Sequence, residues 1–384
     1  MNAQQIISEI CSDVGVVING EQPWDLQVHD QRFFTRTLAE GALGLGETYM
    51  LGWWDCEDLY GFFERLLRSK NLSKHKYAGW RTSFAFLKAE IANIQSVRQT
   101  RQLADTHYNL SNELFESMLG PTMAYSCAYW QGVDNLDDAQ RAKFDLVCRK
   151  LELKPGERVL DIGCGWGGFA RYAIETYGVE VVGVTIAEEQ AEYAKQYCAG
   201  LSFDVACCDY REYEPQNFGG EFDKILSIGM VEHVGYRNYR KLMVAAAEAL
   251  KDQGLFLLHS IGSNISTTSA DSWIDKYIFP GGVLPSMRQL SNASEGLLVI
   301  HDVHNIGVHY TPTLLAWHDR FVRYWESDNK SAALPEVWGS PETFYRMWRY
   351  YLLVCAANFA TGGSQVWQLI LAKGHLAHGY QSHR

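Results

Sequence analysis

A short apolar strand that runs directly into four closely spaced glycines constrains this chain more than any other feature. The stretch reads VLDIGCGWGG over residues 159–168. Glycine lacks a Cβ atom, so the chain can turn sharply out of the strand and let a ligand lie against main-chain amides at a helix start. The pattern therefore predicts a strand, a ligand-binding loop and a helix. A purely structural turn is the alternative, because glycine bends of this kind are common.

The glycine spacing indicates the class of ligand. A dinucleotide fingerprint reads GxGxxG and cradles a pyrophosphate, whereas this chain reads DxGxGxGG. Asp161, just before the glycines, would repel a phosphate but would attract a cationic ligand or the hydroxyl and amine groups around one. A nicotinamide dehydrogenase is therefore disfavoured.

Short apolar segments alternate with amphipathic helices from about residue 159. The strand-like segments are 159–162, 179–185, 203–207, 222–228 and 255–261, followed after two further helices by 365–373. This alternation predicts an α/β fold with a parallel sheet covered on both faces. The rhythm stops over about 262–310, which we expect to form a lid or a substrate-binding wall.

The first part of the chain has a different pattern. Residues 1–101 show helical periodicity, interrupted by the glycine-rich stretch 41–54, and contain no parallel-sheet pattern. A length of 384 residues also exceeds the usual size of one domain. We therefore expect a smaller, mainly helical N-terminal domain at 1–101 and a catalytic domain at 102–384.

Charge, cysteine content and hydropathy exclude several classes. The net charge of −11 argues against a nucleic-acid partner. Nine cysteines without a CxxC pair argue against a disulfide framework or a zinc ribbon. No apolar run is long enough to span a membrane, and the first residues lack the basic start of a signal peptide. These features predict a cytoplasmic protein.

One segment departs from the acidic average. Between Arg65 and Arg101 the chain has nine basic residues and one acid, Glu90. Solvated helix faces would explain such a run, but so would a surface that meets anionic lipid headgroups, where each basic residue contributes about 1 kcal/mol.

Ligands of a parallel α/β sheet lie beyond the carboxyl ends of its strands. Polar and glycine residues follow several of the predicted strands, and we expect these to form the ligand site: Asp161, Gly163, Gly165, Gly167, Thr185, Gln190, Asp209 and Tyr210. Two later strands end in GMVEHVG, with Glu232 and His233, and in LLHSIG, with His259.

Six separated motifs then make a resemblance specific. They are, in order, YSCAYW at 125–130, VLDIGCGWGG, GVTI followed by EEQ, IGMVEHVG, LLHSIGS and IFPGGVLPS. Together they resemble bacterial cyclopropane-fatty-acyl-phospholipid synthases and, less closely, mycolic acid cyclopropane synthases, with the N-terminal GALGLGETYMLGWWDCEDL extending the likeness. The resemblance implies a Rossmann-like class I methyltransferase with a mostly parallel seven-stranded sheet.

The same resemblance implies a chemistry. The family transfers a methylene from S-adenosylmethionine to the cis double bond of an unsaturated phospholipid acyl chain through a carbocation, with bound bicarbonate as the base. Tyr125 and Ser126 would join the S-adenosylmethionine site, and no metal is implied. The residues that match the base pocket are Cys127, Glu232, His259, Ile261 through its backbone, and Tyr310. We expect Glu232 to orient the histidine or to accept the bicarbonate proton.

Further predictions concern the aromatic side chains and the contact with a membrane. Tyr125, Tyr129 and Trp166 would stabilise cationic species through their π faces. A substrate drawn from a bilayer implies a peripheral membrane role, and the aromatic residues near the basic segment would sit at the interface: Trp53, Trp54, Tyr60, Phe62 and Phe63. The resemblance also implies a homodimer.

Alternatives remain open at this point. A related fatty-acid C-methyltransferase or small-molecule N-methyltransferase would use the same donor site. A catalytically silent binding module, a Cys127 thiol nucleophile and a metal site at Glu232, His233 and His259 are weaker readings, because no zinc spacing matches and nothing indicates a lowered thiol pKa.

Overall fold

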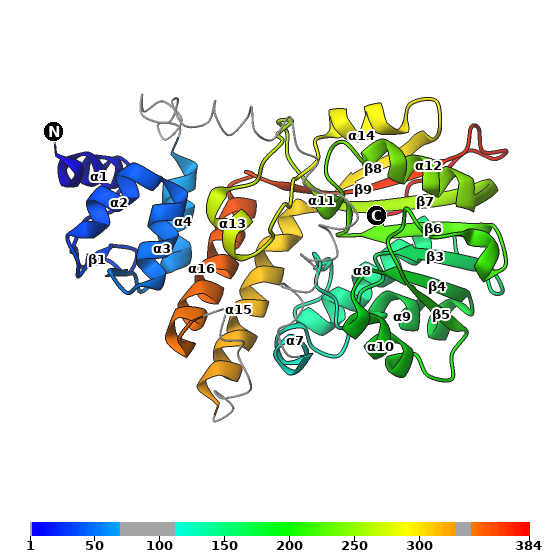
Figure 1. The fold of residues 1–384 in the computed structure, drawn as a ribbon, viewed down its shortest axis with the longest axis horizontal. Coiled ribbons are helices and arrows are strands. Elements are labelled where there is room, and N and C mark those ends of the chain that lie inside the picture. Colours follow the sequence, from blue (N-terminus) through cyan, green and yellow to red (C-terminus); the bar gives the residue numbers. More distant parts are fainter. Residues whose placement is uncertain (1, 70–111, 328–338) are drawn as a thin grey trace.

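The computed structural model describes residues 2–69, 112–327 and 339–384. Its centre is a seven-stranded sheet in the order β5-β4-β3-β6-β7-β9-β8 (Figure 1). The strands are β3 (Arg158–Ile162), β4 (Glu180–Thr185), β5 (Phe203–Cys207), β6 (Phe222–Ile228), β7 (Leu250–Gly262), β8 (Val299–Asn305) and β9 (Gln365–Ala372). Only the pairs that involve β9 are antiparallel in this sheet. The predicted α/β fold with a mostly parallel seven-stranded sheet is confirmed.

Helices cover both faces of the sheet because side chains alternate along each strand. On one face Val159 packs with Phe144 of α8 (Leu136–Lys150) and with α9 (Gly168–Tyr177). On the other face Leu160 packs with Leu242 of α12 (Tyr239–Ala249). The helix α10 (Glu188–Tyr197) links β4 to β5. Each predicted strand and helix of this part is present.

The predicted insertion at 262–310 is more regular than its sequence suggests. It contains α13 (Ser272–Tyr277), α14 (Met287–Ser294) and β8, which forms an edge of the sheet. These residues thus hold regular elements although the alternating pattern stops there in the sequence, and their role as a lid or a substrate-binding wall stays a prediction. β8 was missed because its alternation, VIHDVHN, places polar residues on an edge strand and carries no apolar run.

The N-terminal part is helical, with α1 (Ala3–Ser12), α2 (Arg32–Glu40), α3 (Ala42–Met50), α4 (Leu59–Arg68) and a short hairpin of β1 (Gln27–Val28) and β2 (Trp54–Asp55). The predicted break at 41–54 was wrong over 42–50, which is α3. A Cβ on Gly44 would lie 2.5 Å from the Arg36 carbonyl oxygen, and one on Gly46 would lie 2.3 Å from the Trp273 ring. The glycines therefore serve close packing rather than a turn.

The N-terminal helices pack against α16 (Pro341–Ala360), beside α15 (Tyr310–Glu326), at the end of the molecule away from the sheet (Figure 1). Arg346 of α16 donates from Nη2 to the Trp54 carbonyl oxygen at 2.8 Å. Trp54, Phe62 and Phe63 are at most 1% exposed. Their predicted place at a bilayer interface was wrong, because these rings form a core with α16; Trp53 and Tyr60 are half-buried.

Two expectations fall outside the described residues. The predicted domain boundary at 101/102 does, and so does the basic segment beyond Arg65 and Arg68. Within the described parts of the chain, no helix has the length and apolar character needed to cross a membrane.

Candidate active site

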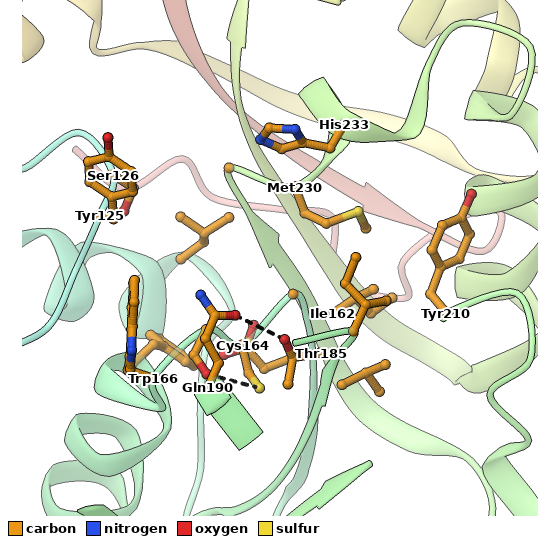
Figure 2. Close-up of a pocket in the computed structure, with 18 of the residues that line it drawn as sticks. Tyr125, Ser126, Ile162, Cys164, Trp166, Thr185, Gln190, Tyr210, Met230 and His233 are labelled. Carbon is orange, nitrogen blue, oxygen red and sulfur yellow. Dashed lines mark hydrogen bonds between the residues drawn. The ribbon is translucent and has the colours of Figure 1, made fainter. Parts of the chain in front are cut away.

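A pocket of about 210 Å³ opens at the carboxyl ends of β3, β4 and β6. Figure 2 shows Tyr125 and Trp166 on one side of it, with Met230 and Tyr210 across from them. Nine of the ten predicted donor-site residues line this pocket: Tyr125, Ser126, Asp161, Gly163, Gly165, Thr185, Gln190, Asp209 and Tyr210. Of the three rings predicted to stabilise cationic species, Tyr125 and Trp166 line the pocket, whereas Tyr129 lies elsewhere, against His309.

The glycines of the loop have two roles: one lies in the wall of the pocket and another packs at the start of a helix. Gly163 has φ +89°, and a Cβ there would lie 2.9 Å from Met230, so a side chain would both strain the backbone and crowd the pocket wall. Gly167, the one predicted donor residue that does not line the pocket, has φ +83° and caps α9. A Cβ at Gly167 would lie 3.2 Å from Cys198 Sγ, so this glycine serves helix packing.

Two hydrogen-bonded side-chain pairs line the pocket. The Thr185 hydroxyl donates to Gln190 Oε1 at 3.0 Å (Figure 2), which leaves the Gln190 amide protons free for a ligand acceptor. Asp209 is 1% exposed and is held by Arg211 through Nε at 2.8 Å and Nη2 at 2.6 Å. Arg211 also lines the pocket and was missed by the sequence analysis.

Asp161 is 3% exposed at the end of β3. Burial raises the pKa of its carboxyl to about 7, and the nearby Lys143 ammonium opposes that rise. A cationic group bound beside Asp161 would hold the carboxylate ionised. This site therefore suits a positively charged ligand.

The five predicted base-pocket residues do not line the pocket; we call them the sealed cluster: Cys127, Glu232, His259, Ile261 and Tyr310. Glu232 lies in the short helix α11 (Val231–Val234), and its Oε1 accepts the Ile261 N–H at 2.7 Å. Among the described residues, its Oε2 is buried without a hydrogen-bond partner. Burial raises the pKa of Glu232 to about 7.

Tyr310 and Cys127 complete one side of the sealed cluster. Burial holds the pKa of the Tyr310 phenol well above its usual value, and nearby Cys127 and Glu232 raise it further. Within the described parts of the chain the phenol makes no hydrogen bond. Burial likewise raises the pKa of the Cys127 thiol above its usual range, which keeps it protonated and argues against a thiolate nucleophile.

His259 lies two residues before Ile261 on β7, with its side chain on the same face of the strand. Its Nδ1 is 3.3 Å from Gln368 Nε2 on β9, and burial holds the pKa of the ring well below its usual value. With Gln368 donating to Nδ1, the ring proton lies on Nε2 and is available to an acceptor. The hydrogen-bond partner of His259 is thus Gln368, and the predicted orientation of this histidine by Glu232 is not seen.

Residues 95–369 match the profile of the family described as mycolic acid cyclopropane synthetase. This chain belongs to that family. The cyclopropane-fatty-acyl-phospholipid synthase of Escherichia coli strain K12 is 45% identical over 97% of this chain and 94% of its own length. The tuberculostearic acid methyltransferase UfaA1 of Mycobacterium tuberculosis is 30% identical over 87% of this chain and 79% of its own length.

Solved structures agree with this family. The mycolic acid cyclopropane synthase CmaA1, solved with SAH and CTAB, aligns with a TM-score of 0.63 and 31% identity over 71% of this chain and 98% of its own. The predictions of a class I methyltransferase fold, of this synthase family and of an S-adenosylmethionine-dependent enzyme are confirmed.

The structure adds pocket residues that were not assigned to the donor site from the sequence of this family member. Met230, His233 and the segment 279–281 line the pocket, as does Lys143. Burial lowers the pKa of His233 to about 4, so its ring is neutral. The motifs GMVEHVG and IFPGG pointed to the first three, whereas Lys143 lies within an ordinary amphipathic helix that carries no signal.

Proposed function

We propose that this chain is a cyclopropane-fatty-acyl-phospholipid synthase that acts on the cis double bond of an unsaturated phospholipid acyl chain. S-Adenosylmethionine supplies an electrophilic methyl group. An alkene is a weak nucleophile, so the site must hold donor and acceptor in near-attack geometry and exclude water that would trap a carbocation. Ring closure then requires a base for one proton of the added methyl group.

One observation carries this proposal: neighbouring residues face two different compartments. Ser126 lines the pocket, whereas Cys127, the next residue, lies in the sealed cluster. His233 lines the pocket, whereas the preceding Glu232 turns to Ile261. These opposite directions support a methyl-donor site and a largely buried polar cluster on the two sides of one wall, as a transfer followed by deprotonation requires.

The sealed cluster suits a small oxyanion such as bicarbonate, which we propose as the base. Glu232 Oε2 has no hydrogen-bond partner, and the Tyr310 hydroxyl and the His259 Nε2 proton can donate. Bound bicarbonate would supply a proton acceptor beside the acyl chain. Glu232 and the backbone of Ile261 would hold it from one side, and Cys127, His259 and Tyr310 from the others.

The chemistry of the acceptor also places the enzyme at a lipid surface. An acyl chain that is part of a phospholipid lies in a bilayer, so we infer peripheral association with an anionic membrane surface from the cytoplasmic side. A homodimer is proposed on the family resemblance. Co-sedimentation with anionic vesicles and analytical ultracentrifugation test these two points separately.

The decisive experiment is turnover on a defined lipid. The purified protein is incubated with S-adenosylmethionine and vesicles of a monounsaturated phospholipid, with and without bicarbonate, and the released acyl chains are analysed by mass spectrometry. We expect a gain of one CH₂ with loss of the alkene, stimulated by bicarbonate.

Two other outcomes redirect the proposal. A methyl-branched or methylene product would identify a fatty-acid C-methyltransferase, for which UfaA1 is a precedent among the relatives. Absence of any acyl product despite donor binding would contradict a lipid acceptor and favour a small-molecule N-methyltransferase.

A further inference from the structure

The helix α8 lies behind the wall that carries Tyr125 and Ser126, and two of its side chains hold that wall. Gln140 Nε2 donates to the Ser126 carbonyl oxygen at 2.9 Å and to the Ala124 carbonyl oxygen at 3.3 Å. One turn later, Lys143 Nζ donates to the Ser126 hydroxyl at 2.9 Å. The helix therefore fixes both the backbone and the side chain of Ser126.

Lys143 is an unusual residue for such a place. It is 1% exposed, and its ammonium has three protons but a single hydrogen-bond acceptor among the described residues. It forms no ion pair within the described parts of the chain, although its Nζ lies 4.2 Å from the centroid of the Phe144 ring. The titratable groups near it are Asp161, Cys127 and His259. A buried ammonium with so few partners is costly unless an anion completes it.

The contact with Lys143 determines what Ser126 can do. A hydroxyl that accepts a hydrogen bond keeps its own proton for another partner. Ser126 Oγ has no other partner in the described structure, and the residue lines the pocket. Its O–H, polarised by the ammonium behind it, is therefore available to an acceptor in the pocket, and an anionic acceptor would benefit most.

S-Adenosylmethionine has one anionic group, the carboxylate of its amino-acid end. The other cation of the pocket, Arg211, is already paired with Asp209. Lys143 and Asp161 lie near each other at one end of the pocket and supply one positive and one negative charge. This pair of charges is complementary to the carboxylate and the ammonium of an amino acid. Among the described residues that line the pocket, no other charged pair is left for this zwitterion.

We propose that Lys143 is a positioning residue that selects the carboxylate of the methyl donor by holding and polarising the Ser126 hydroxyl. This inference rests on the proposed methyl-donor site, and it goes further by naming the group that is recognised. It does not depend on the identity of the methyl acceptor.

Two ligands that differ only at the amino-acid end test it. S-Adenosylhomocysteine has the carboxylate, and 5′-methylthioadenosine lacks the whole amino-acid group. By calorimetry, Lys143→Met should weaken S-adenosylhomocysteine binding about tenfold or more, as for the loss of a charge-assisted hydrogen bond, and should change 5′-methylthioadenosine binding by less than about twofold. Equal losses for both ligands, or no loss, would overturn the proposal.

Lys150 offers a matched control on the same helix. It is 0% exposed and lies 3.7 Å from Asp302, away from the pocket. Lys150→Met removes a buried ammonium from α8 as Lys143→Met does, so it should leave the ratio of the two affinities unchanged. A similar change in ratio for both variants would show a general effect on the helix and would contradict the proposal.

A second variant keeps the test independent of the folding of Lys143→Met. Ser126→Ala should show the same selective loss of S-adenosylhomocysteine affinity. If Lys143 acts through Ser126, the double variant should lose about as much as the worse single variant, since the two changes break one interaction. Fully additive losses would show that the two residues act separately. If the wild type binds S-adenosylhomocysteine but shows no acyl turnover, the proposed function is contradicted, whereas the affinity measurements above still test the role of Lys143.

Discussion

The donor pocket and the sealed cluster lie side by side but differ in how their polar groups are satisfied. In the pocket, Thr185 is paired with Gln190 and Asp209 with Arg211. In the sealed cluster, Glu232 Oε2 has no partner. The carboxylate of Asp209 and the Thr185–Gln190 pair are thus held by the protein, while the Lys143 ammonium and the Tyr210 hydroxyl of the pocket are left for a ligand; in the sealed cluster the group without a partner among the described residues is instead a carboxylate oxygen. This contrast is expected where one compartment binds and the other accepts a proton.

The largest expected effect separates the two regions by chemistry. Glu232→Gln keeps the size of the side chain and an oxygen that can accept the Ile261 N–H, but it removes the acidity and turns the Oε2 acceptor into an NH₂ donor. We expect turnover to fall about 10²- to 10⁴-fold, the range for loss of an acid–base group, with S-adenosylhomocysteine affinity changed less than about twofold. Steady-state rates and calorimetry measure both. Equal losses would refute a role for Glu232 confined to the sealed cluster.

A smaller effect is expected in the glycine loop. Gly163→Ala places a Cβ 2.9 Å from Met230 at φ +89° and should weaken S-adenosylhomocysteine binding about tenfold, for a strain of about 1–3 kcal/mol. Gly156→Ala is the control: its φ is +81°, and a Cβ there has nothing within 4 Å. Both variants should lose stability in thermal unfolding, but only Gly163→Ala should lose donor affinity.

The donor pocket should also respond to pH. Burial lowers the pKa of Lys143 to about 7, and a bound carboxylate would raise it, so binding takes up a proton and weakens as pH rises. The titratable groups that face Lys143 are Asp161 on β3, Cys127 and His259 on β7. Burial raises the pKa of Asp161 to about 7, and this carboxyl would lose a proton when the ligand ammonium binds, so it opposes the effect of Lys143 in the same pH range. We therefore expect the wild type to lose three- to tenfold more S-adenosylhomocysteine affinity than Lys143→Met between about pH 7 and 8.5, roughly one pKa unit. The ligand amine also titrates, so Lys143→Met supplies the baseline; an identical slope would contradict the prediction.

The smallest effect is expected at Cys127. Its thiol contacts the Ala128 carbonyl oxygen at 3.3 Å, and burial keeps it protonated. Cys127→Ser preserves a donor of similar size, so turnover should fall by less than about threefold, within the range of a weak hydrogen bond. Complete inactivation, or a covalent adduct found by intact-protein mass spectrometry in the wild type, would instead support a nucleophilic thiol.

The donor pocket could largely be predicted from the sequence because its residues follow strand ends. Asp161, Thr185 and Asp209 each come directly after or at the end of a short apolar strand, and parallel strands bring these positions to one edge. Lys143 and Arg211 could not be predicted in this way. Their roles depend on which side chain lies beside them after folding, and neither residue type in a helix or loop indicates a buried partner.

The packing of the N-terminal part could not be predicted from its composition. Its aromatic residues have the composition of a membrane interface, yet Trp54, Phe62 and Phe63 lie in the core against α16. The stretch GALGLGETYM has the composition of a loop, yet it is a helix whose glycines admit Arg36 and Trp273. Local composition reports how apolar or how permissive a segment is, but not what it packs against.

The sequence by itself determined where the strands and helices of the α/β part lie along the chain, where the glycine loop lies and to which family the chain belongs. These depend on local periodicity and on motifs of fixed spacing. Only the tertiary structure decided that Ser126 and Cys127 face different compartments, that Glu232 binds Ile261 and that Lys143 holds Ser126. The contacts of Glu232 and Lys143 join residues that are separated along the chain. They are set by the packing of α8, β7 and α11 around the segment that carries Ser126 and Cys127.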